Sequence, residues 1–195
     1  METRDKLKIN LKRLIPAIRG DWFLSDGGLL GIERQGDLLE WDNDLDIYLL
    51  PGSYIDTDIL REQGLELQDY YMDTKIYDPL LDKNKLNIWK EYQGYIRVLN
   101  KEKKLNRCEL MSIASKDYKE KKIIPKFTIP YIDVYYLRDD LSIDYWDIKY
   151  DEEDMDLEEN FDLGYKIYIP NNRNKILTKL YGDSWRTPNP NFQHF

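Results

Sequence analysis

The chain has 195 residues, 29 of them basic and 37 acidic, and a net charge of -8 at pH 7. A surface with this balance is poorly suited to neutralising a phosphate backbone, so we expect no nucleic-acid partner. The single cysteine excludes an internal disulfide and a zinc site built from cysteines. A chain of this length can bury a substantial core, and we predict one domain over residues 1–195.

The sequence shows no membrane or export signal. No stretch is apolar over the ~20 residues that a spanning helix needs. The first residues are charged and lack the apolar core of a signal peptide. We therefore expect a soluble, cytoplasmic protein with no membrane span.

Residues 6–18 are expected to form the first helix. Their apolar side chains recur at spacings of three and four, which is typical of an amphipathic helix, and Pro16 and Gly20 end it. The apolar run 22–24 then predicts a short strand that stops at Ser25.

Two adjacent glycines, Gly27 and Gly28, follow this strand. Glycine permits a positive φ and close backbone approach, so the pair predicts a tight turn. A short helix is expected to begin at Leu29 and to run to Arg34. The turn would then lie at a helix N-terminus, where free amide groups favour anions.

Two later segments alternate with a period of two, which predicts strands. In segment 44–50, Asp44 and Asp46 would share one face, and the aliphatic residues would face the core: Leu45, Ile47 and Leu49. Segment 131–136 carries Asp133 on the face opposite Ile132 and Val134. A third carboxylate is therefore available on a strand.

Shorter patterns assign the segments between these strands. We expect a helix at 55–62, an extended segment at 95–99 and a charged turn at 101–104. The acidic run 151–159 predicts a solvated loop.

The C-terminal part is expected to contain one strand and one helix. Residues 164–170 resemble a strand. Asn172 can cap a helix that runs to Tyr181, and Gly182 can end it.

The aspartates on the predicted strands suit metal-assisted phosphate chemistry. Two carboxylates two residues apart on a strand point the same way and can share a hard divalent cation. The cation neutralises a leaving phosphate, and a third carboxylate completes the site or acts as a base. Asp44, Asp46 and Asp133 are the candidates. Acidic pairs are common on surfaces, but these two lie on a strand made otherwise of core residues, where uncompensated charge is costly.

Two other carboxylate motifs were weighed. An EF-hand starting at Asp42 is excluded, because that loop needs glycine at its sixth position and glutamate at its twelfth, where this chain has Ile47 and Ser53. Nucleotide-sugar glycosyltransferases also use Asp-x-Asp, but usually after an apolar strand rather than before one. That assignment remains a minor alternative.

Several motifs occur in an order that resembles a known family. Residues 26–31 read DGGLLG, Arg34 follows, and residues 41–47 read WDNDLDI. Further along come the segment 131–134, YIDV, and the segment 180–185, LYGDSW. Together these motifs resemble the LicD and fukutin family of the nucleotidyltransferase-fold superfamily. The resemblance implies an α+β fold with a mixed sheet flanked by helices.

The resemblance also implies an activity and its partners. Members transfer a phospho-alcohol, such as phosphocholine or ribitol phosphate, from a CDP-activated donor to a glycan hydroxyl and release CMP. The implied cofactor is Mg²⁺, with Mn²⁺ as an alternative.

The family's site residues carry over by position. Gly27 and Gly28 would border the donor phosphates, and Arg34 would pair with a donor phosphate or form a surface ion pair. The implied catalytic and metal-binding aspartates are Asp44, Asp46 and Asp133, with Asp42 as a further metal ligand or supporting group.

Some positions depart from the family pattern without removing a carboxylate. Gly28 replaces the usual threonine, and Gln35 stands where histidine is common. Tyr181 and Trp185 can stack on a sugar or a base, although packing in the core or a lid is favoured. His194, the only histidine, is given no role, so a histidine-activated nucleophile is not expected.

Two other functions stay open. One is transfer of a nucleoside monophosphate to a small molecule, a protein or an RNA end. The other is a non-catalytic, nucleotide-binding descendant, against which the three aligned carboxylates argue.

Overall fold

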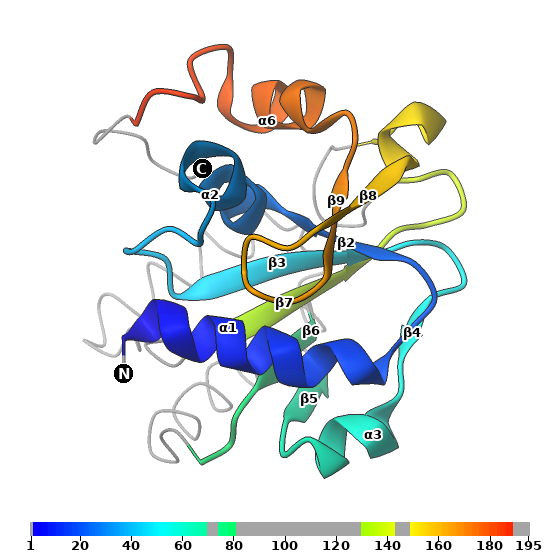
Figure 1. Ribbon diagram of the computed structural model, residues 1–195. Helices are drawn as coiled ribbons and strands as arrows, with labels where there is room; N and C mark the ends of the chain where they lie inside the picture. Colours follow the sequence, from blue (N-terminus) through cyan, green and yellow to red (C-terminus); the bar gives the residue numbers. More distant parts are fainter. Residues whose placement is uncertain (1, 70–73, 81–129, 143–148, 189–195) are drawn as a thin grey trace, which may run out of the picture.

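The computed structural model describes residues 2–69, 74–80, 130–142 and 149–188 (Figure 1). The extended segment expected at 95–99 and the turn expected at 101–104 lie outside these residues. The fold is α+β, as the sequence predicts. Its centre is a five-stranded mixed sheet with the order β2-β3-β7-β6-β5. The strands are β2 (Trp22–Ser25), β3 (Asp44–Leu49), β7 (Tyr131–Tyr136), β6 (Thr74–Tyr77) and β5 (Glu66–Asp69).

The central strand of the sheet, β7, is also its last strand in the chain. It pairs in parallel with β3 on one side and antiparallel with β6 on the other. The β2–β3 and β5–β6 pairs are antiparallel. Alternation along β3 is as predicted, with Leu45, Ile47 and Leu49 at most 1% exposed. Asp44 and Asp46 are partly exposed on the other face.

Helix α1 (Thr3–Leu14) packs along β7, and η1 (Ile15–Ala17) continues it (Figure 1). The α1 side chains Leu7, Leu11 and Leu14 are completely buried in the core. The predicted helix is therefore confirmed, with Pro16 in the single 3₁₀ turn that ends it.

A second layer of small elements surrounds the sheet. Strands β1 (Ile18–Arg19) and β4 (Tyr54–Ile55) pair, and α3 (Thr57–Glu62) follows. Asp56 caps α3 by accepting hydrogen bonds from the amides of its first turn. The helix expected at 55–62 is thus present but begins two residues later, because its first residue belongs to β4.

The C-terminal region forms a hairpin and a helix. Strands β8 (Leu157–Asn160) and β9 (Ile167–Pro170) pair, and β9 lies next to β2 (Figure 1). Helix α6 (Arg173–Tyr181) then packs against α2 and ends at Gly182, which has a φ of 80°. The predicted strand and helix are confirmed.

The acidic run 151–159 is not the solvated loop that the sequence suggested. It forms η2 (Glu152–Met155) and strand β8. Asp154 is only 4% exposed, and its carboxylate accepts a hydrogen bond from Lys175 at 3.0 Å. A lysine from α6 compensates the buried charge, and the spacing of the run does not reveal this partner.

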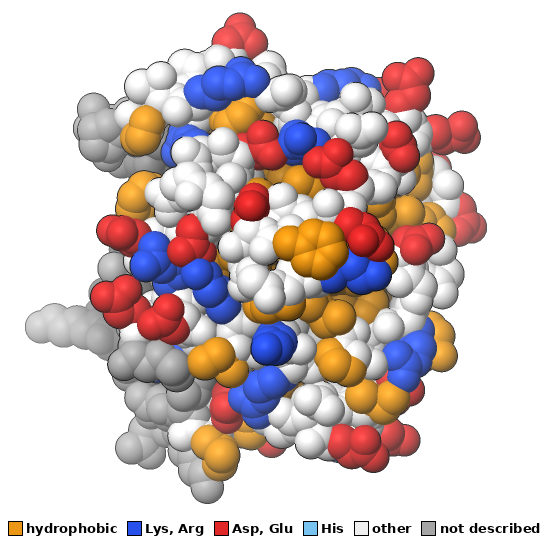
Figure 2. Space-filling model, in the orientation of Figure 1, with side chains coloured by type: hydrophobic (Ala, Val, Ile, Leu, Met, Phe, Trp, Pro, Cys, Tyr) orange, Lys and Arg blue, Asp and Glu red, His pale blue; other side chains and the backbone are white. Residues whose placement is uncertain are grey.

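Several charged side chains of the described residues form ion pairs that join separate elements. Arg173 contacts Glu33 and Glu158 at 2.5 Å each, which joins α6 to α2 and β8. On the face that Figure 2 draws, acidic and basic side chains are intermixed. Among the described residues, no helix is both long and apolar enough to cross a membrane.

Candidate active site

The strand register brings polar side chains from four strands into one row. Ser25 pairs with Asp46, Asp46 with Asp133, and Asp133 with Lys75. Paired residues on adjacent strands project from the same face of a sheet. Two of the predicted aspartates, Asp46 and Asp133, are therefore neighbours although they lie far apart in the chain.

A second polar pair lies one step further along the same face. Asp44 is opposite Tyr131 in the β3–β7 ladder. The Tyr131 hydroxyl donates a hydrogen bond to Asp44 Oδ2 at 2.9 Å. This contact holds one carboxylate oxygen of the predicted metal-binding pair in a defined position.

Aromatic rings form the wall on the other side of the polar row. Tyr48 stacks on Phe23 and on Tyr135, with ring centroids 5.3 and 5.0 Å apart. The edge of Tyr150 meets the Phe23 and Tyr48 rings at 5.9 and 5.8 Å. These rings give the site an apolar boundary beside Asp46, and electrostatic interactions are stronger next to such a boundary than in water.

Lys75 and Asp133 form a buried ion pair in the row. The Lys75 Nζ and Asp133 Oδ1 atoms are 2.5 Å apart, and the two residues are 3% and 5% exposed. The ammonium group also lies 4.2 Å from the centroid of the Tyr131 ring. No motif or spacing in the sequence marks Lys75 or Tyr131 as a site residue.

Strand β2 leads directly into helix α2 (Asp26–Gln35), with no separate turn between them. The helix expected from Leu29 begins three residues earlier because Asp26 adopts a φ of 48°, which reverses the chain within one residue. Gly27 and Gly28 therefore lie in the first helical turn, where amide groups have no partner within the helix. Their predicted contact with donor phosphates stays a prediction.

The two glycines make room for different neighbours. A Cβ atom at Gly27 would collide with the Asp42 carboxylate. At Gly28 it would lie 2.8 Å from the Cδ1 atom of Leu24, whose side chain is completely buried. Tight packing on Leu24 leaves little room for a side chain at position 28.

Burial and the charges of neighbouring carboxylates raise the pKa values of two aspartates. Burial, the charge of Asp44 and a hydrogen bond with Asp44 raise the Asp42 pKa to about 8, with a smaller contribution from Asp26. Burial raises the pKa of Asp46 well above its usual value, and the charges of Asp26, Asp44 and Asp133 add to this shift. Asp26 is a further carboxylate of this group, and the sequence analysis did not assign it to the site.

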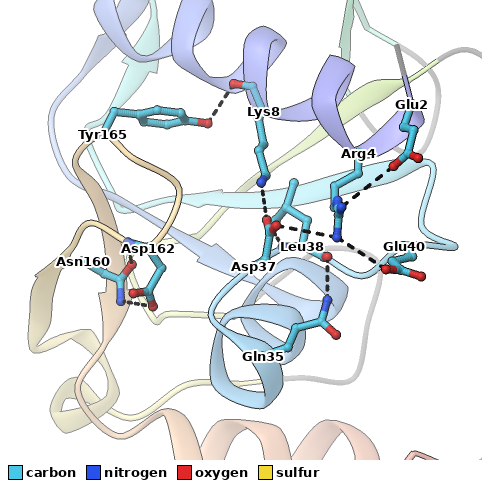
Figure 3. Close-up of polar contacts among 10 residues, drawn as sticks. All are labelled: Glu2, Arg4, Lys8, Gln35, Asp37, Leu38, Glu40, Asn160, Asp162 and Tyr165. Atoms are coloured by element: carbon cyan, nitrogen blue, oxygen red, sulfur yellow. Dashed lines mark hydrogen bonds and ion pairs between the residues drawn. The ribbon is translucent and has the colours of Figure 1, made fainter.

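The loop that carries Asp42 is anchored on α1 (Figure 3). Asp37 Oδ1 accepts from Lys8 Nζ at 2.5 Å and from the Leu38 amide at 2.7 Å. Burial opposes ionisation of Asp37, but the contacts with Lys8 and Leu38 outweigh it and lower its pKa. Arg4 lies 3.6 Å from the same carboxylate. These contacts fix the chain shortly before Asp42 and support its position over Gly27.

Arg34 donates hydrogen bonds to backbone carbonyl groups of the C-terminal segment. Its Nε atom lies 2.7 Å from the Trp185 oxygen, and one of its terminal nitrogens lies 3.4 Å from the Thr187 oxygen. Trp185 is 3% exposed and Tyr181 packs against the core, so both aromatic residues pack as favoured. Arg34 thus joins α2 to the segment after α6. This role differs from the phosphate contact and from the surface ion pair that the sequence suggested.

The aspartates fit a divalent cation in chemistry but do not form a complete cage. Within the part of the chain that the structure describes, no three acidic, histidine or cysteine side chains are grouped as a ready-made metal site. Mg²⁺ usually takes only one or two carboxylates and completes its shell with water and substrate phosphates. The crowded carboxylates Asp42, Asp44 and Asp46 meet this requirement, whereas Asp133 is paired with Lys75.

A family model described as LicD/FKTN/FKRP, nucleotidyltransferase domain, matches residues 20–122. The chain belongs to the LicD family. The match contains β2, α2 and β3, and with them Gly27, Arg34 and the aspartates of β3. It ends before Asp133. No curated protein matches the chain.

Membership of the LicD family indicates a transferase with phospho-alcohol transferase-like activity in general. It also confirms the resemblance drawn from the DGGLLG and WDNDLDI segments, which both lie inside the matched residues.

Proposed function

We propose that this protein transfers a phospho-alcohol from a CDP-activated donor to a glycan hydroxyl and releases CMP. The observation that carries the proposal is the group of carboxylates at the start of β3, where burial, together with the charges of neighbouring aspartates, raises the pKa values of Asp42 and Asp46. Such crowding favours the binding of a cation and its bound phosphates. Membership of the LicD family supports the same class of reaction.

In this proposal Asp44 and Asp46 hold Mg²⁺, and Asp42 supports them. The bound ion would neutralise negative charge on the donor phosphates. Tyr131 orients Asp44 through its hydroxyl group. The aromatic wall around Tyr48 bounds the site beside Asp46. The amides in the first turn of α2, which have no partner within the helix itself, would add a place for a phosphate oxygen.

The transfer is a single displacement at phosphorus. The acceptor oxygen forms a bond to the phosphorus that carries the alcohol. The bond from that phosphorus to the CMP oxygen breaks, and its electron pair leaves with CMP. The acceptor proton passes to a carboxylate of the group. The products are CMP and a glycan bearing the phospho-alcohol.

Calorimetric titration with CDP-choline, CDP-ribitol, CTP and UDP-glucose, with and without Mg²⁺, tests the donor class. We expect Mg²⁺-dependent binding of a CDP-alcohol that Asp46→Asn abolishes. Asp139→Asn is the matched control, because it removes the same charge from an exposed residue and should bind like the wild type. A CDP-alcohol that binds equally well to the Asp46→Asn protein would contradict the proposal.

The family description favours one second candidate, nucleotidyl transfer, in which an acceptor attacks the phosphorus next to cytidine. Donor labelled in its cytidine group separates the two reactions in the presence of a glycan mixture. Free labelled CMP supports phospho-alcohol transfer, whereas label on the acceptor or preferential binding of CTP supports nucleotidyl transfer.

A further inference from the structure

Lys75 is a cation of the protein itself inside the acidic part of the sheet. It lies in the row that also contains Asp46 and Asp133, and its Nζ atom is 2.5 Å from Asp133 Oδ1. Lys75 is 3% exposed, so solvent does not screen its charge effectively. Strand β6 therefore brings a fixed positive charge to the β7 side of the carboxylate group.

The pairing limits what Asp133 can do. Separating a buried ion pair leaves two uncompensated charges in a poorly hydrated place, and that cost is several times larger than that of an exposed pair. A divalent cation that took Asp133 as a ligand would also have to approach the Lys75 ammonium group, which repels it. Both effects favour cation binding on the β3 side, away from Lys75.

The contact of Lys75 with Tyr131 also favours cation binding on the β3 side. Its ammonium group lies 4.2 Å from the Tyr131 ring centroid, and the hydroxyl of that ring donates to Asp44. Lys75 thus contacts the ring of Tyr131, and the hydroxyl group of Tyr131 holds Asp44. One lysine fixes Asp133 directly and Asp44 through an intervening ring.

We propose that Lys75 is the permanent counter-ion of Asp133 and a positioning residue of the site, so that the cation binds to the aspartates of β3 and the preceding loop and not to Asp133. The inference rests on the proposed function, because it assumes a divalent cation at Asp46. It removes Asp133 from the metal ligands that the family resemblance implied and leaves Asp42, Asp44 and Asp46.

Binding of Mn²⁺, followed by the loss of its free electron paramagnetic resonance signal, tests the inference without any substrate. Four proteins are compared: the wild type, Asp46→Asn, Lys75→Gln, and the double variant Lys75→Gln/Asp133→Asn. The double variant removes the ion pair without changing the net charge, and its amide groups can still hydrogen-bond to each other. Melting in EDTA identifies any variant that does not fold.

We expect Asp46→Asn to weaken Mn²⁺ binding at least about tenfold and the double variant to stay within about threefold of the wild type. Lys75→Gln alone should bind Mn²⁺ at least about threefold more tightly, because it frees a carboxylate and removes a repelling charge. A purely structural role of Lys75 would not increase the affinity.

Each contrary result has its own meaning. A double variant that loses as much affinity as Asp46→Asn shows that Asp133 is a ligand, and it overturns the inference while leaving the proposed metal site intact. Unchanged or weaker binding by Lys75→Gln also overturns it. A wild type that binds no Mn²⁺, or an Asp46→Asn protein that binds it normally, overturns the proposed metal site and the inference with it.

Discussion

Neighbouring residues of β3 belong to two very different regions. Ile47 lies on the aliphatic face of the sheet, is completely buried, and pairs with Val134 across the parallel ladder. Asp46 lies on the opposite face, where burial and the neighbouring carboxylates raise its pKa. The same backbone hydrogen bonds support both side chains. The aliphatic face therefore stabilises the fold, whereas the acidic face is maintained at a cost in stability.

This division explains why the strand tolerates its aspartates. Ladder hydrogen bonds and aliphatic packing hold β3 in place, so repulsion on the other face cannot displace it. Functional sites often retain such locally unfavourable groups, and removing them then stabilises the protein. The comparison predicts opposite stability effects for adjacent substitutions.

The largest expected effect is a loss of stability in Ile47→Ala. It should lower the free energy of unfolding by about 2–5 kcal/mol, because it opens a cavity in a packed core. Urea unfolding followed by circular dichroism measures the change. Ile47→Val, expected to cost about 0.5–1.5 kcal/mol, is the graded control. A loss below that of the valine variant would show that the core is loosely packed here.

Gly28→Ala tests the point where α2 meets the aliphatic face. The added methyl group would lie 2.8 Å from Leu24 Cδ1, so we expect a loss of about 1–3 kcal/mol from overpacking. Gly36→Ala is an uncrowded comparison, although its φ of 67° adds backbone strain. In a Leu24→Ala background the contact is absent, so Gly28→Ala should lower the free energy of unfolding by less than it does in the wild type. Independent, additive effects in the double variant would argue against the contact.

Asp46→Asn is expected to have the opposite sign in the absence of metal. The substitution removes a carboxylate whose ionisation is opposed by burial and by neighbouring charges, and it should raise the free energy of unfolding in EDTA by about 0.5–2 kcal/mol. The exposed Asp139→Asn variant should change it by less than about 0.5 kcal/mol. A destabilised Asp46→Asn protein would mean that the carboxylate makes favourable contacts that outweigh the repulsion.

The smallest expected effect is a pH dependence of the metal-free protein. Folding raises the Asp42 pKa from 3.8 to about 8, so the folded state keeps a proton that the unfolded state has lost. Stability from this group is therefore lost as the pH rises through that window. We expect the melting temperature to fall by about 1–3 °C for each half unit of pH from about pH 6 to about pH 7.5, because the folded state holds nearly one extra proton there. The Asp42→Asn protein should show a flatter profile, and an identical slope would contradict the assignment.

The alternation of side chains and the sequence motifs correctly predicted the strands whose pattern is visible within the strand itself. The strand at 131–136 has its predicted limits, and β3 ends one residue before its predicted end. In both strands aliphatic residues alternate with acidic or aromatic ones, and the aliphatic residues are buried as the alternation predicts. The motifs around Gly27 and Asp44 likewise pointed to the family that the match confirms.

The missed residues depend on partners that are remote in the sequence. Lys75 interrupts a short strand and would be expected to face solvent, yet it is buried because Asp133, 58 positions away, compensates its charge. Asp154 was misassigned for the same reason, since its partner Lys175 lies on α6. Asp26 was overlooked because one positive φ moved the start of the helix. No local pattern encodes any of these contacts.

The order of the sheet has a consequence for how the protein is made. Strand β7 is inserted between β3 and β6, yet residues 50–130 separate it from β3 in the chain. Parallel strands cannot be joined by a tight turn, and closing such a long connection is slow. On the ribosome, the strands on either side of β7 emerge long before it does. The row from Asp46 to Lys75 is therefore complete only once the last strand of the sheet has docked, and a truncated or unfinished chain lacks both its central strand and its site.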